Sequence, residues 1–162
     1  NLGWIYATGQ AGNKDVAKAI YWYQRASTNG HVDAQVKLAT IYHNGVDVPE
    51  NLESARRWFE MAATQGNPTA QFNLGVMQFN AEGGKQDIEQ AILWFKQAAQ
   101  QELAVAQYTL GMFYQDGKVV EQDLEAARHW LNQAALNAAK GDDFLDDLAR
   151  RIRLLLADTD NA

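Results

Sequence analysis

The sequence predicts an all-α protein, an α/α solenoid built from stacked two-helix units. Two residue types recur with a period of 36 along the 162-residue chain. Tryptophan stands at positions 22, 58, 94 and 130, and leucine at positions 2, 38, 74 and 110. No insertion breaks this register across four copies, which indicates a repeat architecture. A single hairpin cannot cover its own apolar faces, so such units must stack on one another.

The composition is that of an ordinary folded domain, and it argues against several functions. The chain is 47% hydrophobic and 21% charged, with a formal net charge of −6. An acidic protein lacks the basic face that nucleic acids or anionic membranes require. No apolar run approaches the ~20 residues needed to span a bilayer. The absence of cysteine excludes disulfides, thiolate nucleophiles and cysteine-ligated metals. The compartment stays open between the cytoplasm and the periplasm or cell envelope.

Each copy of the repeat predicts two helices, called helix A and helix B below. In the second copy, helix A covers about 32–44 and places Ala34, Leu38 and Ile41 on one stripe at helical spacing. A turn at "GVDVPE" follows, and helix B begins after Asn51, a favourable N-cap residue. Aspartate occupies the equivalent cap position in the other copies, at 15, 87 and 123.

The tryptophans of the repeat are predicted to pack in the core between neighbouring units. Ala55, Trp58 and Ala62 lie three and four residues apart, so they share one face of helix B. The two alanines allow another helix to approach closely, and the indole fills the remaining volume. Burying an aromatic side chain of this size removes roughly 150–250 Å² from water.

The repeat closely resembles the Sel-1-like repeat family, a branch of the tetratricopeptide superfamily. The resemblance rests on Leu-Gly, a tyrosine three residues later, a loop glycine, a capping aspartate and Ala-x-x-Trp-x-x-x-Ala. The best copies are "LGMFYQDGKVVEQDLEAARHWLNQAA" and "LGWIYATGQAGNKDVAKAIYWYQRAS", and the resemblance covers about residues 1–140. It implies a right-handed superhelical solenoid. It also implies a role as an adaptor for partner proteins, often in bacterial envelope, signalling or host-contact pathways.

A few positions depart from the family pattern. Gln78 replaces the tyrosine, Ala81 replaces the loop glycine, and Glu102 stands where Gly30 and Gly66 close their units. These departures leave the shape of the loop at 78–86 open but do not alter the predicted fold.

The repeats are expected to form one domain over residues 1–157. Its units cover about 1–31, 32–67, 68–103 and 104–140, and a capping helix covers about 142–157. Residues 158–162 are expected to form a disordered tail. The N-terminal side has no such cap, so we expect the natural protein to continue upstream.

Nothing in the sequence supports a catalytic, metal-binding or cofactor-binding assignment. "DDFLDD" resembles an Asp-rich metal motif but lacks a second acidic motif, and acidic residues are typical of a helix start. His31, His43 and His129 have neither a metal-binding partner at helical spacing nor a nearby nucleophile. "GGKQD" lacks the spacing of a phosphate-binding loop. We therefore expect no enzyme activity, no metal and no cofactor.

The helix A positions that break the repeat pattern are the predicted partner-binding face. Positions 33, 37, 40 and 44 share one side of the helix. By analogy with tetratricopeptide solenoids, this side lines the concave groove. The predicted binding residues are Trp4, Asp33, Lys37, Thr40, Asn44, Thr69, Asn73, Val76, Asn80, Val105, Thr109, Met112 and Asp116.

Three functions remain in competition. The first is a non-catalytic scaffold that binds a partner protein or peptide segment in this groove, without nucleic acid and without membrane insertion. The second is a cell-wall-related hydrolase or penicillin-binding activity, as described for some cysteine-rich relatives. This chain lacks their cysteines and has no matching Ser-x-x-Lys arrangement. The third is an architectural segment of a larger repeat protein that associates with itself through the uncapped end at Trp4.

Overall fold

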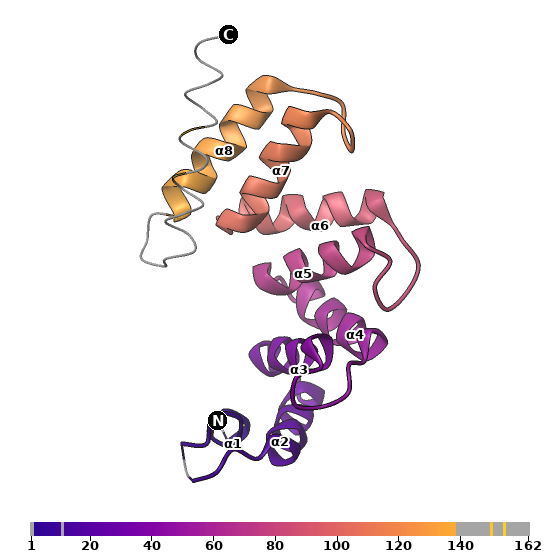
Figure 1. Cartoon of the computed structure of the whole chain (residues 1–162), viewed down its shortest axis with the longest axis vertical. Helices are drawn as coiled ribbons and strands as arrows, with labels where there is room; N and C mark the ends of the chain where they lie inside the picture. The colour runs from indigo at the N-terminus through magenta and orange to yellow at the C-terminus, as the bar shows by residue number, and fades with distance from the viewer. Residues whose placement is uncertain (1, 11, 139–149, 151–153, 155–162) are drawn as a thin grey trace. The chain divides into compact units, whose positions relative to one another are not determined.

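The computed structural model describes residues 2–10, 12–138, 150 and 154. Within these residues the regular secondary structure is entirely helical (Figure 1). The chain divides into two compact units, Asn1–Ala91 and Ile92–Ala162, and each is considered by itself below. No helix in the described part of the chain has the length and apolar character needed to cross a membrane.

The first unit consists of successive helical hairpins. Its helices are α1 (Leu2–Thr8), α2 (Val16–Thr28), α3 (Val32–Asn44), α4 (Leu52–Thr64) and α5 (Pro68–Phe79). Each of these helices packs on the next along the chain. Helix α3 has the bounds predicted for helix A, because the repeat register and the caps define both of its ends.

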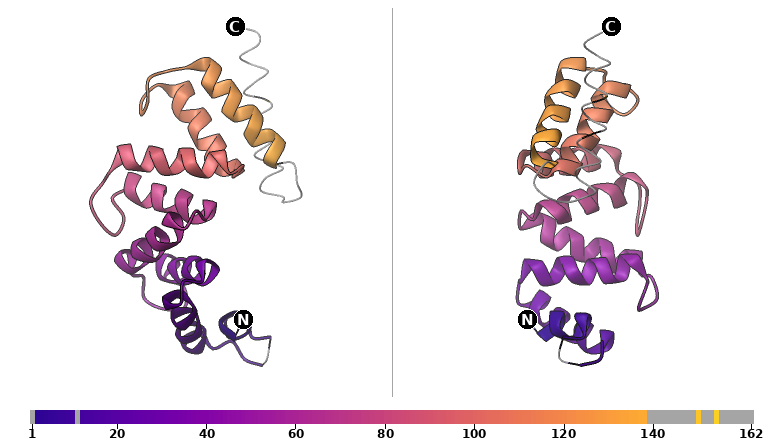
Figure 2. Two further views of the ribbon diagram at one scale, coloured as in Figure 1. Left: turned by 180° about the vertical axis from the view of Figure 1, so that it is seen from behind. Right: turned by 60° about the vertical axis from the view of Figure 1, so that its left-hand side comes forward.

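The second unit contains α7 (Ala104–Asp116) and α8 (Leu124–Ala138), which pack side by side as a hairpin (Figure 2). Helix α6 (Ile88–Gln100) begins in the first unit and continues in the second. The predicted capping helix at 142–157 falls almost wholly outside the described residues, and the predicted tail at 158–162 lies outside them entirely.

The helix B caps form as predicted, with one side-chain bond at each start. Oδ1 accepts a backbone N–H three residues later at Asp15, Asn51, Asp87 and Asp123, over 2.9–3.0 Å. The backbone N–H of each cap also donates to a carbonyl of the preceding helix A, for example from Asn51 to Tyr42 over 2.8 Å. Asp87 makes the same bond to Gln78 over 3.0 Å. Because a main-chain carbonyl accepts this bond, glutamine serves there as well as tyrosine.

The unusual loop at 78–86 keeps the left-handed backbone conformation of its counterparts at the residue where it leaves helix A. Ala81 has a φ of 61°, beside 62° at Gly45 and 66° at Gly117. Glu102 likewise has a φ of 64°, where Gly66 has 88°. Two residues with side chains therefore occupy the left-handed region that normally favours glycine.

The core repeats with the sequence, but the deepest aromatic rings are those that follow Trp58 and Trp94. Phe59 and Phe95 are both 2% exposed, whereas Trp58 and Trp94 are only half-buried. Trp58 still packs on a cluster that contains Tyr23 of α2, so it joins successive hairpins. Trp58 thus joins successive hairpins as expected, but the more deeply buried side chain is that of Phe59.

A row of buried glutamines ties each helix A to the helix B before it. Nε2 of Gln35, Gln71 and Gln107 donates to a main-chain carbonyl eight residues earlier, over 3.0–3.2 Å. All three side chains are at most 3% exposed. Their 36-residue spacing is visible in the sequence, but their role was not predicted.

Candidate functional site

The residues of the predicted binding face are all accessible to solvent to some degree. In the first unit they lie on α1, α3 and α5, and in the second unit on α7. The exposed members are Trp4, Asp33, Lys37, Asn44, Thr69, Asn80 and Asp116. The half-buried members are Thr40, Asn73, Val76, Val105, Thr109 and Met112. Their role in binding remains a prediction.

Several polar side chains on this face hydrogen-bond their own helix. Thr40 donates from Oγ1 to the carbonyl of Val36, and Asn73 donates from Nδ2 to that of Thr69, both over 2.8 Å. Thr109 makes the same bond, over 2.8 Å, in the second unit. Each of these groups uses a hydrogen-bond donor on its own helix. The face therefore offers a ligand more acceptors than donors.

Met112 has a structural task in addition to its predicted place on the face. It packs on the buried cluster of Leu131 and Ala134 on α8. A charged substitution at Met112 would therefore disturb the α7–α8 hairpin as well as any bound partner, so the polar members are better probes of the face.

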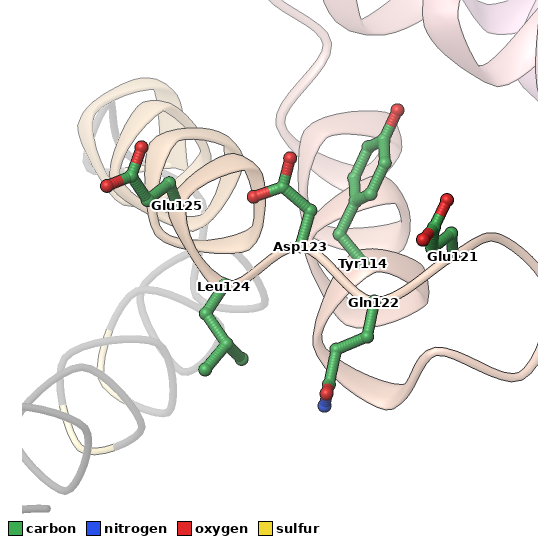
Figure 3. Close-up of a pocket in the computed structure, with 6 residues that line it drawn as sticks. All are labelled: Tyr114, Glu121, Gln122, Asp123, Leu124 and Glu125. Carbon is green, nitrogen blue, oxygen red and sulfur yellow. The ribbon is translucent and has the colours of Figure 1, made fainter.

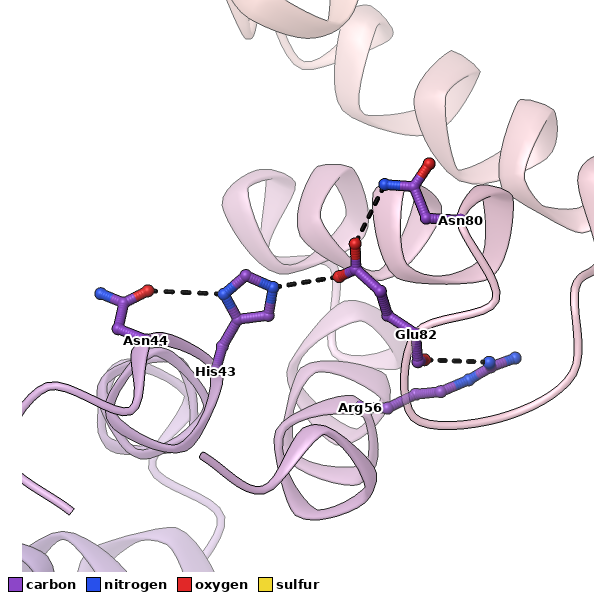
Figure 4. Close-up of polar contacts among 5 residues, drawn as sticks. All are labelled: His43, Asn44, Arg56, Asn80 and Glu82. Carbon is purple, nitrogen blue, oxygen red and sulfur yellow. Dashed lines mark hydrogen bonds and ion pairs between the residues drawn. The ribbon is translucent and has the colours of Figure 1, made fainter. Parts of the chain in front are cut away.

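The structure connects two predicted residues, Asn44 and Asn80, through two residues that were not predicted. His43 Nε2 lies 3.1 Å from Glu82 Oε2, and Asn80 Nδ2 donates to Glu82 Oε1 over 3.0 Å (Figure 4). His43 Nδ1 lies 3.4 Å from Asn44 Oδ1 on the other side of the ring. We call these four residues the His43–Glu82 cluster.

The loop that carries Glu82 is held against α4. Arg56 Nη1 donates to the main-chain oxygens of Glu82 and Lys85, over 3.3 and 3.0 Å. A Cβ added at Gly83 would overlap the carbonyl of Leu52, so the loop backbone lies directly on the first turn of α4. These contacts fix the position of the Glu82 backbone relative to α3 and α4.

An open depression of about 710 Å³ lies in the second unit at the start of α8 (Figure 3). Its lining includes Tyr114, Glu121, Asp123 and Glu125. The Asp123 carboxylate is engaged as a helix cap through the Ala126 N–H at 2.9 Å. The acidic residues here match the preference of a helix start for negative charge.

The described residues contain no group of three or more His, Cys, Asp or Glu side chains arranged to hold a metal. The resolved pKa shifts have structural causes. The backbone N–H of Lys18 lowers the pKa of Asp15 at its cap, and burial raises the pKa of Tyr23.

Comparison with known proteins identifies the repeat. The Sel1 repeat profile matches residues 1–31, 32–67, 68–103 and 104–138. The chain belongs to the Sel1 repeat family. This confirms the family inferred from the sequence, and the first three matched segments coincide with the predicted units.

Solved structures of Sel1 repeat proteins confirm the solenoid fold class. A protective antigen of uropathogenic Escherichia coli, c5321, is 35% identical with a TM-score of 0.80, over 89% of this chain and 30% of that one. A Sel1 repeat protein from Oxalobacter formigenes is 31% identical with a TM-score of 0.80, over 85% of this chain and 40% of that one.

A more distant structure shares the fold alone. The immunity protein Pa5087 of Pseudomonas aeruginosa is 22% identical with a TM-score of 0.56, over 94% of this chain and 66% of that one. The chain thus spans less than half the length of the first two Sel1 repeat structures. No curated protein sequence matches it.

Proposed function

We propose that this Sel1 repeat chain is a non-catalytic scaffold that binds a protein or peptide segment on its helix A face. Sel1 repeat proteins are generally protein-interaction scaffolds. The observation that carries the proposal is a difference in burial between recurring and varying positions of helix A. The recurring helix A leucines of the inner repeats are buried, as at Leu38 and Leu74, which are 0% exposed. The positions that vary on α3 and α5 stay accessible.

The test is capture of a partner with the chain as bait, followed by mass spectrometry. We expect Asn44→Ala with Asn80→Ala to weaken capture of a specific partner, because both amides are exposed on the proposed face. Asn13→Ala with Asn132→Ala is the matched control, since these exposed amides lie in a loop and on a helix B. Equal capture by the two double variants would exclude this face.

The alternative enzymatic function is addressed by a separate measurement. The Sel1 repeat fold is typically a non-catalytic scaffold, and we propose that this chain has no hydrolase activity. Turnover of a β-lactam or a cell-wall fragment by the purified chain, abolished by a single side-chain substitution, would contradict this.

A further inference from the structure

The His43–Glu82 cluster occurs at one junction of the repeat only. At the equivalent positions, Ala7 and Val46 replace His43 and Glu82 one repeat earlier, and Phe79 and Lys118 replace them one repeat later. Contacts that stacking requires recur with the 36-residue period, as the buried glutamines do. A polar cluster that does not recur is therefore not demanded by the architecture.

We propose that Glu82 and Asn80 form an acceptor site for an arginine side chain of the partner. This inference rests on the proposed function, because it assigns the chemistry of one anchor on the same helix A face. The site would accept hydrogen bonds from the guanidinium and supply one negative charge.

The Glu82 carboxylate is oriented and still accessible. Its two oxygens receive one internal contact each, from Asn80 Nδ2 at 3.0 Å and from His43 Nε2 at 3.1 Å. A carboxylate offers about four lone-pair sites, so acceptor capacity remains on both oxygens. The side chain of Glu82 is 29% exposed. A ligand thus meets a carboxylate that is already held in place.

Asn80 adds a carbonyl oxygen to this site, because it spends its amide nitrogen on Glu82 and keeps Oδ1 as an acceptor. Asn44 lies on the far side of the His43 ring, where its Oδ1 is 3.4 Å from Nδ1, so it is not part of the acceptor site.

Neither Arg56 nor Lys85 forms an ion pair with the Glu82 carboxylate. Arg56 spends Nη1 on the main-chain oxygens of Glu82 and Lys85. Lys85 is exposed, and the ion pairs of the described residues join Glu82 to His43 alone.

Arginine matches these acceptors better than lysine does. The guanidinium carries five N–H donors in a planar fork and no acceptor, whereas the lysine ammonium is a compact point charge. Bonds between a guanidinium and a carboxylate are shorter and stronger than neutral hydrogen bonds. A site made of one carboxylate and one amide oxygen therefore favours an arginine anchor.

The experiment uses two decapeptides, (Gly-Arg)5 and its neutral counterpart (Gly-citrulline)5, titrated into the full chain by calorimetry. We expect (Gly-Arg)5 to bind more tightly, and Glu82→Gln to weaken its binding by on the order of fivefold, as loss of one charge-assisted bond implies. Glu60→Gln is the matched control, because Glu60 is an exposed acid of α4 outside the cluster, and it should leave affinity unchanged. NMR shifts of the His43 ring and of the Asn80 side-chain amide should follow the same titration.

Two results would overturn the arginine site. One is equal binding of both peptides, and the other is equal weakening by Glu82→Gln and Glu60→Gln, which would indicate general attraction to an acidic protein. If a captured natural partner loses affinity with Asn44→Ala and Asn80→Ala but not with Glu82→Gln, the proposed scaffold stands and the arginine anchor fails. If neither double nor single variants alter capture, the proposed face fails as well.

Discussion

Gln35 donates from its fully buried amide nitrogen to the carbonyl oxygen of Ser27, 3.1 Å away at the end of the preceding helix. Its Oε1 in turn accepts from Gln65 Nε2 over 2.8 Å, at the end of the following helix. One side chain therefore joins three consecutive helices. In the second unit, Gln107 bonds Ala99 and accepts from Asn137 in the same way. Hydrogen bonds in the core thus supplement apolar packing in holding the repeats in register.

Replacing Gln107 with Leu should destabilise the chain by about 1–3 kcal/mol. The substitution introduces an apolar side chain of similar size and leaves the buried carbonyl of Ala99 without its donor, which is costly in a dry interior. Urea denaturation followed by circular dichroism gives the free energy of unfolding. Gln100→Leu, at an exposed position at the end of α6, is the control and should change stability little. A neutral effect of Gln107→Leu would show that the row is incidental.

The left-handed conformations at Ala81 and Glu102 predict two stabilising substitutions. A side chain in this region costs roughly 1–2 kcal/mol, while glycine adopts it freely. Part of this gain is lost because glycine makes the unfolded chain more flexible. We expect Ala81→Gly and Glu102→Gly each to raise the free energy of unfolding by about 0.5–1 kcal/mol, measured by urea denaturation.

The converse change supplies the control for Glu102. Gly66 occupies the equivalent position with a φ of 88°, and a Cβ there meets no neighbouring atom within 4 Å. Gly66→Ala should therefore destabilise through backbone strain alone, by about 1 kcal/mol. Stabilisation by Gly66→Ala, or destabilisation by Glu102→Gly, would contradict the assigned backbone conformations.

The sequence was sufficient to predict the helices because their ends depend on local residues. Asn51 caps α4 through the N–H of Ser54, and the 36-residue register carries the same cap to the other units. Which of Trp58 and Phe59 is more deeply buried could not be predicted in this way. Both residues fall within the buried arc of α4, and their depth depends on which residues of the neighbouring helices meet them.

The candidate face was predictable only as a set of accessible positions. Helical geometry placed Asn44 and Asn80 at equivalent points of α3 and α5, and both are exposed. The contact between His43 and Glu82 joins residues 39 positions apart and depends on how the 80–87 loop lies on α4. No local pattern specifies that contact, so the sequence does not predict it.

The close approach of α7 and α8 predicts a steric conflict at Gly111. A Cβ added there would lie 2.7 Å from Cγ of Leu131, and 3.3 Å from the carbonyl of Ala127. Gly111→Ala should therefore destabilise the chain by about 1–3 kcal/mol, as overpacking of a well-filled core does. The double variant with Leu131→Ala should show a favourable coupling energy, because the smaller side chain relieves the contact. Additive effects of the two substitutions would indicate that the backbone moves apart instead.

Burial of Tyr23 predicts a loss of stability at alkaline pH. The folded chain raises the pKa of this phenol above its ordinary value of 10.0, because burial penalises the phenolate. The unfolded chain therefore loses its proton first as the pH rises. The stabilisation from the neutral phenol is fully present below pH 10 and is lost as the pH rises towards the folded pKa.

The Tyr23→Phe variant has no phenol to ionise at this position. Its unfolding free energy should therefore fall less between pH 9 and about 11 than that of the unmodified chain. Tyr21→Phe, which removes a 52% exposed phenol from the same helix, is the control. Parallel pH profiles for the Tyr23→Phe variant and the unmodified chain would show that Tyr23 ionises as readily in the folded state as in the unfolded one.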